Sequence, residues 1–238
     1  LLLIDMSGVR STTVIGQTWY ISVMLISMLI LYPLIRRYKK TFTNIIAPLI
    51  VIFIGGWLSH KYIGMYNPTL WTGLMYKGLL RGFFELSFGA MLYELTQKVT
   101  KKDFTLLGKI LLTVMEISGF VSIFLISNIK GANGKYEFLM LLILGISIAI
   151  AFSEKTVTYK LSNNKFCYYL EKLSLPIYLN QIWIILLVDK YLKQYNFKIK
   201  LIIAVIATIL ISAIIMFLTE KLLNLIRKIN FKKLIFNN

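Results

Sequence analysis

The chain has 238 residues, a formal net charge of +17 and 58% hydrophobic residues, which is too apolar for a soluble domain of this size. The positive charge could indicate nucleic-acid binding. However, most lysines and arginines fall in short segments between apolar runs, where they orient helices in a membrane. We therefore expect an integral membrane protein with no nucleic-acid partner. The single cysteine, Cys167, excludes an internal disulfide and argues against a cysteine metal site.

The first apolar run predicts a membrane span with a direction. Trp19 to Ile35 contains no charged residue, and as a helix it would cover about 25 Å, close to the thickness of a bilayer core. Trp19 and Tyr20 stand at one end, where amphipathic rings prefer the lipid headgroup layer. The other end is basic and is expected to be cytoplasmic, because it carries Arg36, Arg37, Lys39 and Lys40.

Similar runs recur along the chain and predict an all-α integral membrane protein, a bundle of about seven transmembrane helices. The predicted spans are residues 18–35, 44–60, 79–96, 106–128, 137–153, 173–189 and 201–219. We expect residues 61–78 to form an ordered loop at the membrane interface and residues 156–172 to lie on the membrane surface. Residues 1–238 would then form a single transmembrane domain.

The distribution of basic residues predicts the orientation in the cell membrane. With the amino end outside, the segments on the inner side carry sixteen lysines and arginines and those on the outer side carry nine. We therefore predict a multi-pass protein with its amino end outside and its carboxyl end in the cytoplasm. An odd number of spans in this orientation is natural if one or three spans lie upstream. We therefore expect the sequence to be truncated at the amino end.

Charged residues within the predicted spans are the first candidates for a site, because burying them in hydrocarbon is costly. Arg81 and Glu85 are four residues apart, so they share a helix face and can form an ion pair. The pair could be purely structural, or it could bind an anion or act in acid–base chemistry. Glu116 has no basic neighbour one turn away. It must find a partner on another helix, stay protonated or face a water-filled cavity.

The stretch LEKLSLPIYLNQIWI, residues 170–184, is the second candidate region. Ser174 is expected to cap the sixth span, with Pro176 in its first turn. Tyr178, Asn180 and Gln181 then place three hydrogen-bonding groups in an apolar run. They could tie helices together or line a polar cavity, and we expect Gln181 to face protein rather than lipid. With one histidine, His60, the chain offers no Ser-His-Asp set, and no metal site is expected.

Three stretches together resemble the membrane acyltransferase 3 family, which includes O-acetyltransferases of surface polysaccharides. They are TWYISVMLISMLILYPLI (18–35), LLRGFFELSFGAML (79–92) and LEKLSLPIYLNQIWI. The resemblance covers nearly the whole chain but only the later spans of the ten-span core of that family. The fold that it implies is the C-terminal part of this core.

The resemblance implies transfer of an acyl group, usually acetyl, from acyl-CoA to a hydroxyl of a surface glycan or lipid-linked sugar at the membrane. The family signature on an early span, an arginine followed about ten residues later by a histidine, does not occur in this chain. Gln181 also stands where the family often has a histidine. A neutral amide cannot act as the general base of an acyl transfer, so whether this chain is active stays open.

The sequence is compatible with three functional hypotheses. The first is an O-acyltransferase of the cell envelope that binds no cofactor and uses acyl-CoA as a substrate. The second is a transporter or exporter of a lipid-linked or polar sugar, although the chain shows no internal repeat. The third is a sensor or structural membrane domain, which would not need a buried acid. In the first hypothesis no catalytic group is identified, and the substrate-binding candidates are Trp19, Arg81, Glu85, Glu116, Tyr178, Asn180 and Gln181.

Overall fold

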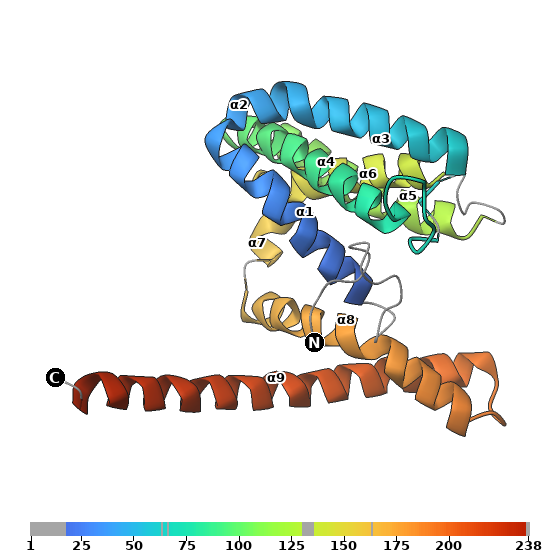
Figure 1. The fold of residues 1–238 in the computed structure, drawn as a ribbon, viewed down its shortest axis with the longest axis vertical. Helices are drawn as coiled ribbons and strands as arrows, with labels where there is room; N and C mark the ends of the chain where they lie inside the picture. Colours follow the sequence, from blue (N-terminus) through green and yellow to red (C-terminus); the bar gives the residue numbers. More distant parts are fainter. Residues whose placement is uncertain (1–17, 63, 66, 130–135, 163, 237–238) are drawn as a thin grey trace. The chain divides into compact units, whose positions relative to one another are not determined.

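The computed structural model describes residues 18–62, 64–65, 67–129, 136–162 and 164–236, and the regular structure in these ranges is helical (Figure 1). The chain divides into two compact units, Leu1–Ser162 and Asn163–Asn238. The first unit contains α1 (Thr18–Arg37), α2 (Lys39–Thr41), the π-helix η1 (Phe42–Ile46), α3 (Ala47–Tyr62), α4 (Lys77–Thr100), α5 (Leu106–Ser127), α6 (Glu137–Ala151) and α7 (Thr158–Ser162). The second contains α8 (Lys165–Tyr191) and α9 (Phe197–Phe236).

Each of the seven predicted spans is a helix, which confirms the all-α membrane fold, but the count of seven spans is not confirmed. In the described part of the chain, five helices are long and apolar enough to cross a bilayer. They correspond to α1, α2 to α3 taken together, α5, α8 and the apolar part of α9. The apolar helix α6 is shorter, and α4 is long but carries charged residues, namely Lys77, Arg81, Glu85, Glu94 and Lys98. The chain is a multi-pass membrane protein.

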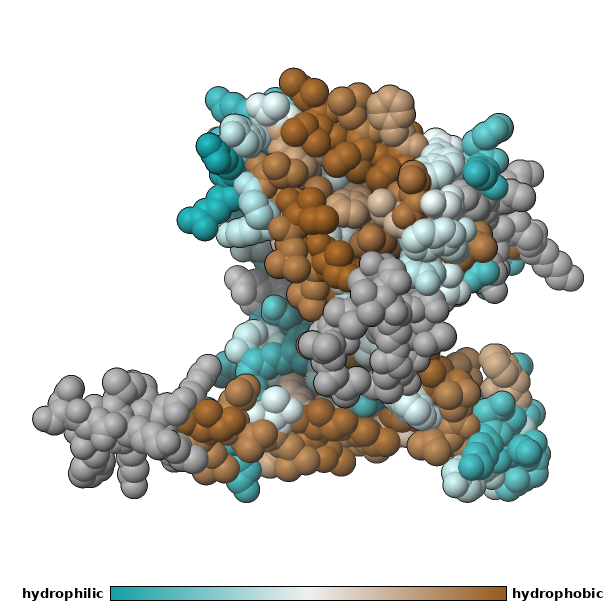
Figure 2. Space-filling view, viewed as in Figure 1, coloured by the Kyte–Doolittle hydropathy of each residue, from teal (hydrophilic) through white to brown (hydrophobic). Residues whose placement is uncertain are grey.

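The first unit is built around α4. The helices α1, α3 and α6 pack against α4, and α5 packs against α6 (Figure 1). Because α4 is enclosed by other helices, it can carry polar and charged side chains that a lipid-facing helix could not. Its neighbours present apolar side chains outward instead, and Figure 2 shows a broad hydrophobic band on this unit between hydrophilic ends. Exposed apolar side chains of α1 and α3 include Leu29, Ile52 and Phe53.

The helices α1, α4 and α6 run in the same direction. Lys39 Nζ, beyond the end of α1, lies 2.9 Å from Glu94 Oε1 near the end of α4, whereas Trp19 lies beside Gly78 at the start of both helices. Early in α4 and α6 the rings of Phe84 and Phe138 meet edge to face, with their centroids 5.6 Å apart. One end of this unit therefore contains the segments that were predicted to lie on the inner side, namely residues 36–40, 98–102 and 155. Successive spans that cross the membrane in alternating directions require this arrangement.

Glycines allow α4 and its neighbours to approach closely. A Cβ added to Gly82 of α4 would lie 2.3 Å from Val23 Cγ1 of α1, which is closer than real contacts allow. A Cβ added to Gly145 of α6 would lie 2.5 Å from Leu92 Cδ1 of α4. These contacts are of the small-residue type that lets membrane helices pack without a hydrophobic driving force. Gly89 differs, because a Cβ there would meet nothing within 4 Å.

The turn from α1 into α3 contains a π-helix. After Tyr38 the chain continues through α2 and η1 directly into α3. Phe42, the first residue of η1, is fully buried in a core with Leu31 and Ala47. The wider winding of η1 thus lies where α1 and α3 meet the middle of α4.

The described residues of the loop between α3 and α4 are joined by backbone hydrogen bonds, in agreement with the ordered loop that the sequence predicts. Gly78 N donates to Pro68 O (2.8 Å), Lys77 N donates to Leu70 O (2.8 Å), and Thr72 N donates to Met75 O (3.0 Å). The backbone of Met65 donates to the Glu137 carboxylate at the start of α6. The loop is therefore bound to the same end of the unit as the amino ends of α4 and α6.

The second unit is the antiparallel pair of α8 and α9, and it corrects part of the prediction for residues 156–184. The helix α8 begins at Lys165 rather than near residue 173, and its cap is Asn164, whose side chain accepts a hydrogen bond from Cys167 N (3.0 Å). Ser174 lies within the helix and donates to Glu171 O (2.7 Å), so it is not the cap. Pro176 also lies within the helix rather than in its first turn.

Candidate functional site

The first element of the site is a charged pair at the amino-terminal end of α4. Arg81 Nε donates to Glu85 Oε1 at 2.5 Å, and the two side chains are 32% and 15% exposed. The guanidinium carbon of Arg81 lies 5.8 Å from the centre of the Trp19 ring, which is within the range of a cation–π contact. The structure thus brings together three of the residues that the sequence predicts, Trp19, Arg81 and Glu85.

A second charged group lies next to this pair. The side chain of Lys77 is 2% exposed at the start of α4. Burial lowers the pKa of its ammonium group, the negative charge of Glu137 offsets part of this shift, and the positive charge of Arg81 adds to it. Lys77 and Glu137 therefore add charges close to Arg81 and Glu85. Of these residues, Arg81 and Glu85 line the cavity described next.

A cleft of about 590 Å³ extends from Arg81 and Glu85 along the surface of α4. Its walls come from α1, α4 and α6, all within the first unit. The residues that line it are Tyr20, Arg81, Glu85, Phe88, Gly89, Leu92, Tyr93, Thr96, Gln97, Leu141, Leu144, Gly145, Ile148, Ala149 and Phe152. The volume is in the range of small-molecule sites, about 300–1,000 Å³. The cleft is polar at its ends and apolar between them.

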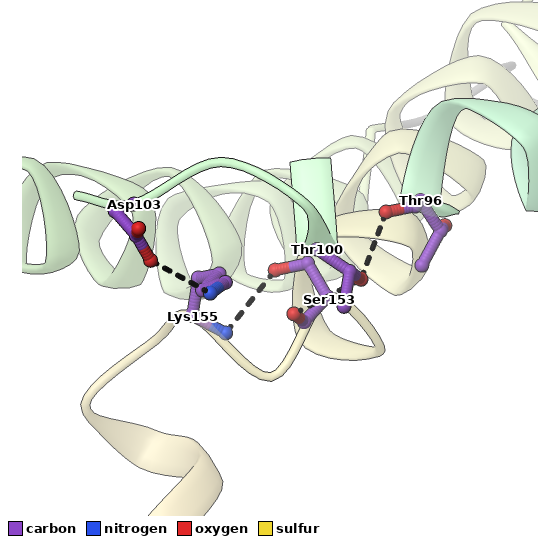
Figure 3. A network of polar contacts seen from close by, with 5 residues as sticks. All are labelled: Thr96, Thr100, Asp103, Ser153 and Lys155. Carbon is purple, nitrogen blue, oxygen red and sulfur yellow. Dashed lines mark hydrogen bonds and ion pairs between the residues drawn. The ribbon is translucent and has the colours of Figure 1, made fainter. Parts of the chain in front are cut away.

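Hydrogen bonds join α4 and α6 at the other end of the cleft (Figure 3). Thr96 Oγ1 donates to Ala149 O at 3.3 Å, and Thr100 Oγ1 donates to Ser153 O at 3.2 Å. In the same network Lys155 Nζ lies 3.7 Å from Asp103 Oδ1. These contacts hold the two helices together at the basic end of the unit, whereas Arg81 and Glu85 mark the opposite end.

Glu116 lies in a second cavity of about 380 Å³. Its Oε2 accepts a hydrogen bond from Thr158 Oγ1 at 2.7 Å, and Thr156 and Tyr159 line the same cavity. The sequence left three environments open for Glu116, and the structure gives it both a partner outside its own helix and a cavity. Phe152 lines both cavities, so Glu116 and the Arg81–Glu85 pair lie in adjacent but separate spaces.

Tyr178, Asn180 and Gln181 belong to α8 in the second unit, so their place in a site with Arg81 or Glu116 stays a prediction. All three side chains are half-buried. The buried residue of α8 is Ile184, about one turn after Gln181. The partly covered side of the helix therefore includes Gln181, whereas Ile185 is exposed.

Most of the residues that line the cleft were not predicted from the sequence, although the sequence contains a signal for them. Continuing from Arg81 and Glu85 in steps of three or four residues leads to Gly89, Tyr93 and Gln97. These residues recur on one side of α4, and all of them line the cleft. Extending the helical period of the ion pair would have predicted that one side of α4 lines a site along most of the helix.

A sequence profile described as an acyltransferase domain matches residues 4–219. This match covers most of the chain and both compact units. The chain belongs to the acyltransferase 3 family. The comparisons with curated proteins and with solved structures gave no match. As a member of the acyltransferase 3 family, the protein is a membrane acyltransferase in general terms, which the apolar helices of both units accord with.

Proposed function

We propose that the protein transfers an acyl group, acetyl in the simplest case, from acyl-CoA to a hydroxyl of a cell-envelope glycan. The observation that carries this proposal is the cleft of about 590 Å³ with the Arg81–Glu85 pair at one end, in a chain of the acyltransferase 3 family. The site of action is the cell membrane, with the amino end of the chain outside and the carboxyl end in the cytoplasm. The grouping of basic residues at one end of the first unit supports this orientation.

The chemistry needs a proton acceptor and a group that holds negative charge. The hydroxyl oxygen bonds to the acyl carbon, the carbon–sulfur bond of the thioester breaks, and the hydroxyl proton ends on the departing thiolate. The carboxylate of Glu85 can accept this proton and return it to the sulfur. The guanidinium of Arg81 can stabilise the oxyanion that forms at the acyl carbonyl. The pair therefore supplies both functions without the histidine of the family signature.

The alternative function, export of a lipid-linked or polar sugar, is not favoured, because the family match describes acyl transfer. A translocation path would use the same polar positions, so the distinguishing result is a covalent product. Transport would move the sugar across a vesicle membrane and leave its mass unchanged.

The test is an acyl-transfer assay on the purified protein in vesicles, with labelled acetyl-CoA and a glycan acceptor. We expect an acetylated product from the wild type and a fall in kcat of about 10²-fold or more in Glu85→Gln, because the amide accepts no proton. The matched control is Glu94→Gln, which removes a carboxylate of the same helix that pairs with Lys39 and does not line the cleft. Absence of product from well-folded wild type would refute the proposed function, and full activity of Glu85→Gln would remove Glu85 from it.

A further inference from the structure

The cleft is long and follows the helix axis. Its lining residues on α4 extend from Arg81 to Gln97 and occur in every turn between them. Sixteen steps of about 1.5 Å give a length of about 24 Å, most of the thickness of a bilayer core. The lining residues on α6, from Leu141 to Ala149, and Phe152 just after it follow the same direction because α6 runs parallel to α4. The cleft therefore lies along the direction in which lipid chains extend.

The cleft has room for a lipid chain. Its volume is about 590 Å³, within the range of sites that hold small molecules, about 300–1,000 Å³. A single hydrocarbon chain is about 4–5 Å wide, because the carbon atoms of neighbouring chains pack about 4 Å apart. The space along α4 therefore accommodates an extended chain.

The chemistry of the walls changes along the cleft. Between its ends the lining is aliphatic or aromatic, with Phe88, Leu92 and Ile148 among its members. At the end near Arg81 and Glu85, charged groups can bind a polar headgroup. At the opposite end, the hydrogen bond from Thr96 to Ala149 ties α4 to α6. A chain with one polar end would therefore lie with its head at Arg81.

Gly89 lies midway along the cleft, eight residues from Arg81 and eight from Gln97. A Cβ at this position would meet nothing within 4 Å, so its missing side chain is not explained by helix packing. The helix pays for this glycine in backbone entropy relative to alanine. An empty position on the wall of the cleft leaves space at its centre.

We infer that the cleft binds one extended hydrocarbon chain of a membrane lipid, with the polar head of the lipid at Arg81 and Glu85 and the chain passing Gly89. The idea that this lipid carries the hydroxyl to be acylated rests on the proposed function. The binding of the lipid in the cleft does not depend on that function. The chain could be a phospholipid acyl chain or a polyprenyl chain, and two probes distinguish these sources.

The experiment uses the full chain in phosphatidylglycerol vesicles that contain either a phospholipid with a diazirine on its acyl chain or a polyprenyl phosphate with the same group. After illumination, mass spectrometry measures the lipid adducts on Phe88 and Leu92, which are half-buried on α4. We expect adducts from at least one probe. In Gly89→Leu they should fall about tenfold, because the added side chain blocks the cleft.

The control is Gly56→Leu on α3, another helical glycine at which a Cβ meets nothing within 4 Å, but outside the cleft. Its adducts on Phe88 and Leu92 should equal those of the wild type. Gly89→Ala adds a smaller side chain to the wall of the cleft. This variant replaces Gly89→Leu in the experiment if Gly89→Leu does not fold. Adducts that are absent with both probes, or that persist unchanged in the folded Gly89 variants, would overturn the inference. No acyl donor is present, so failure of acyl transfer leaves this result intact.

Discussion

The helices α4 and α5 are close in length but differ in what surrounds them. The helix α5 contacts α6 on one side, and most of its apolar side chains are exposed, as expected for a helix that faces lipid. The helix α4 is enclosed by α1, α3 and α6 and carries the charged pair and the cleft. Of the two, hydropathy identifies α5 as a membrane span and not α4. In this protein the helix with the weaker membrane signal carries the candidate site.

The largest expected effect concerns packing around α4. Phe84 on α4 is 4% exposed and Phe124 on α5 is 69% exposed. Phe84→Ala should lower the free energy of unfolding by about 3–5 kcal/mol, because it removes a ring packed against α3 and α6. Phe124→Ala should change it by less than about 1 kcal/mol, because its ring faces the apolar solvent. Reversible unfolding in detergent micelles measures both, and equal losses would show that α4 and α5 do not differ in enclosure.

The next effect concerns the ion pair. Arg81→Met leaves the Glu85 carboxylate without its partner and should cost about 1–3 kcal/mol, reduced from the value for a buried pair because Arg81 is partly exposed. The double variant Arg81→Met, Glu85→Gln should recover much of this stability. The same cycle on Lys39 and Glu94, a more exposed pair, is the control and should show a coupling below about 1 kcal/mol. If the double variant recovers both folding and acyl transfer, the pair is only structural.

Replacing either of two glycines on α4 by alanine should change the stability of the protein, but in opposite directions. Gly82→Ala places a methyl group against Val23 and Ser27 and should destabilise the protein by about 1–2 kcal/mol. Gly89→Ala enters open space and should stabilise it by up to about 1 kcal/mol, because alanine favours the helix. Thermal unfolding of both variants compares them directly. A loss of stability in Gly89→Ala would mean that this wall of the cleft is packed.

The smallest effect is a pH dependence at the start of α4. Because the pKa of Lys77 is lowered below 10.5, the folded chain binds fewer protons there than the unfolded chain at pH values between the two pKa values. Stability from this group should therefore rise as the pH increases through the lowered pKa and level off above 10.5. Lys77→Met should remove this rise, and Lys109→Met, at the exposed start of α5, should retain it. Identical pH profiles for the two variants would exclude Lys77 as the source.

The sequence was sufficient to predict the helices and the local pair, because both depend on residues near each other in the chain. Apolar runs marked the helices, and a spacing of four placed Arg81 against Glu85. The contact of Trp19 with Arg81 and the cavity partner of Glu116 depend on how helices pack, and no local pattern contains that information. The cap of α8 was misplaced because Ser174 and Pro176 resemble a helix start, whereas Asn164 provides the cap earlier.

The π-helix from Phe42 to Ile46 has a consequence for changes in chain length. A π-turn accommodates one residue more than an α-turn while the helix on either side keeps its phase. Removing the exposed Asn44 would let this segment return to α-winding, with Phe42 and Ala47 still facing their core. Removing a residue from the middle of α3 would instead rotate one half of the helix by about 100° against the other. Shortening by one residue is therefore best tolerated at this turn, beside the helix that carries the candidate site.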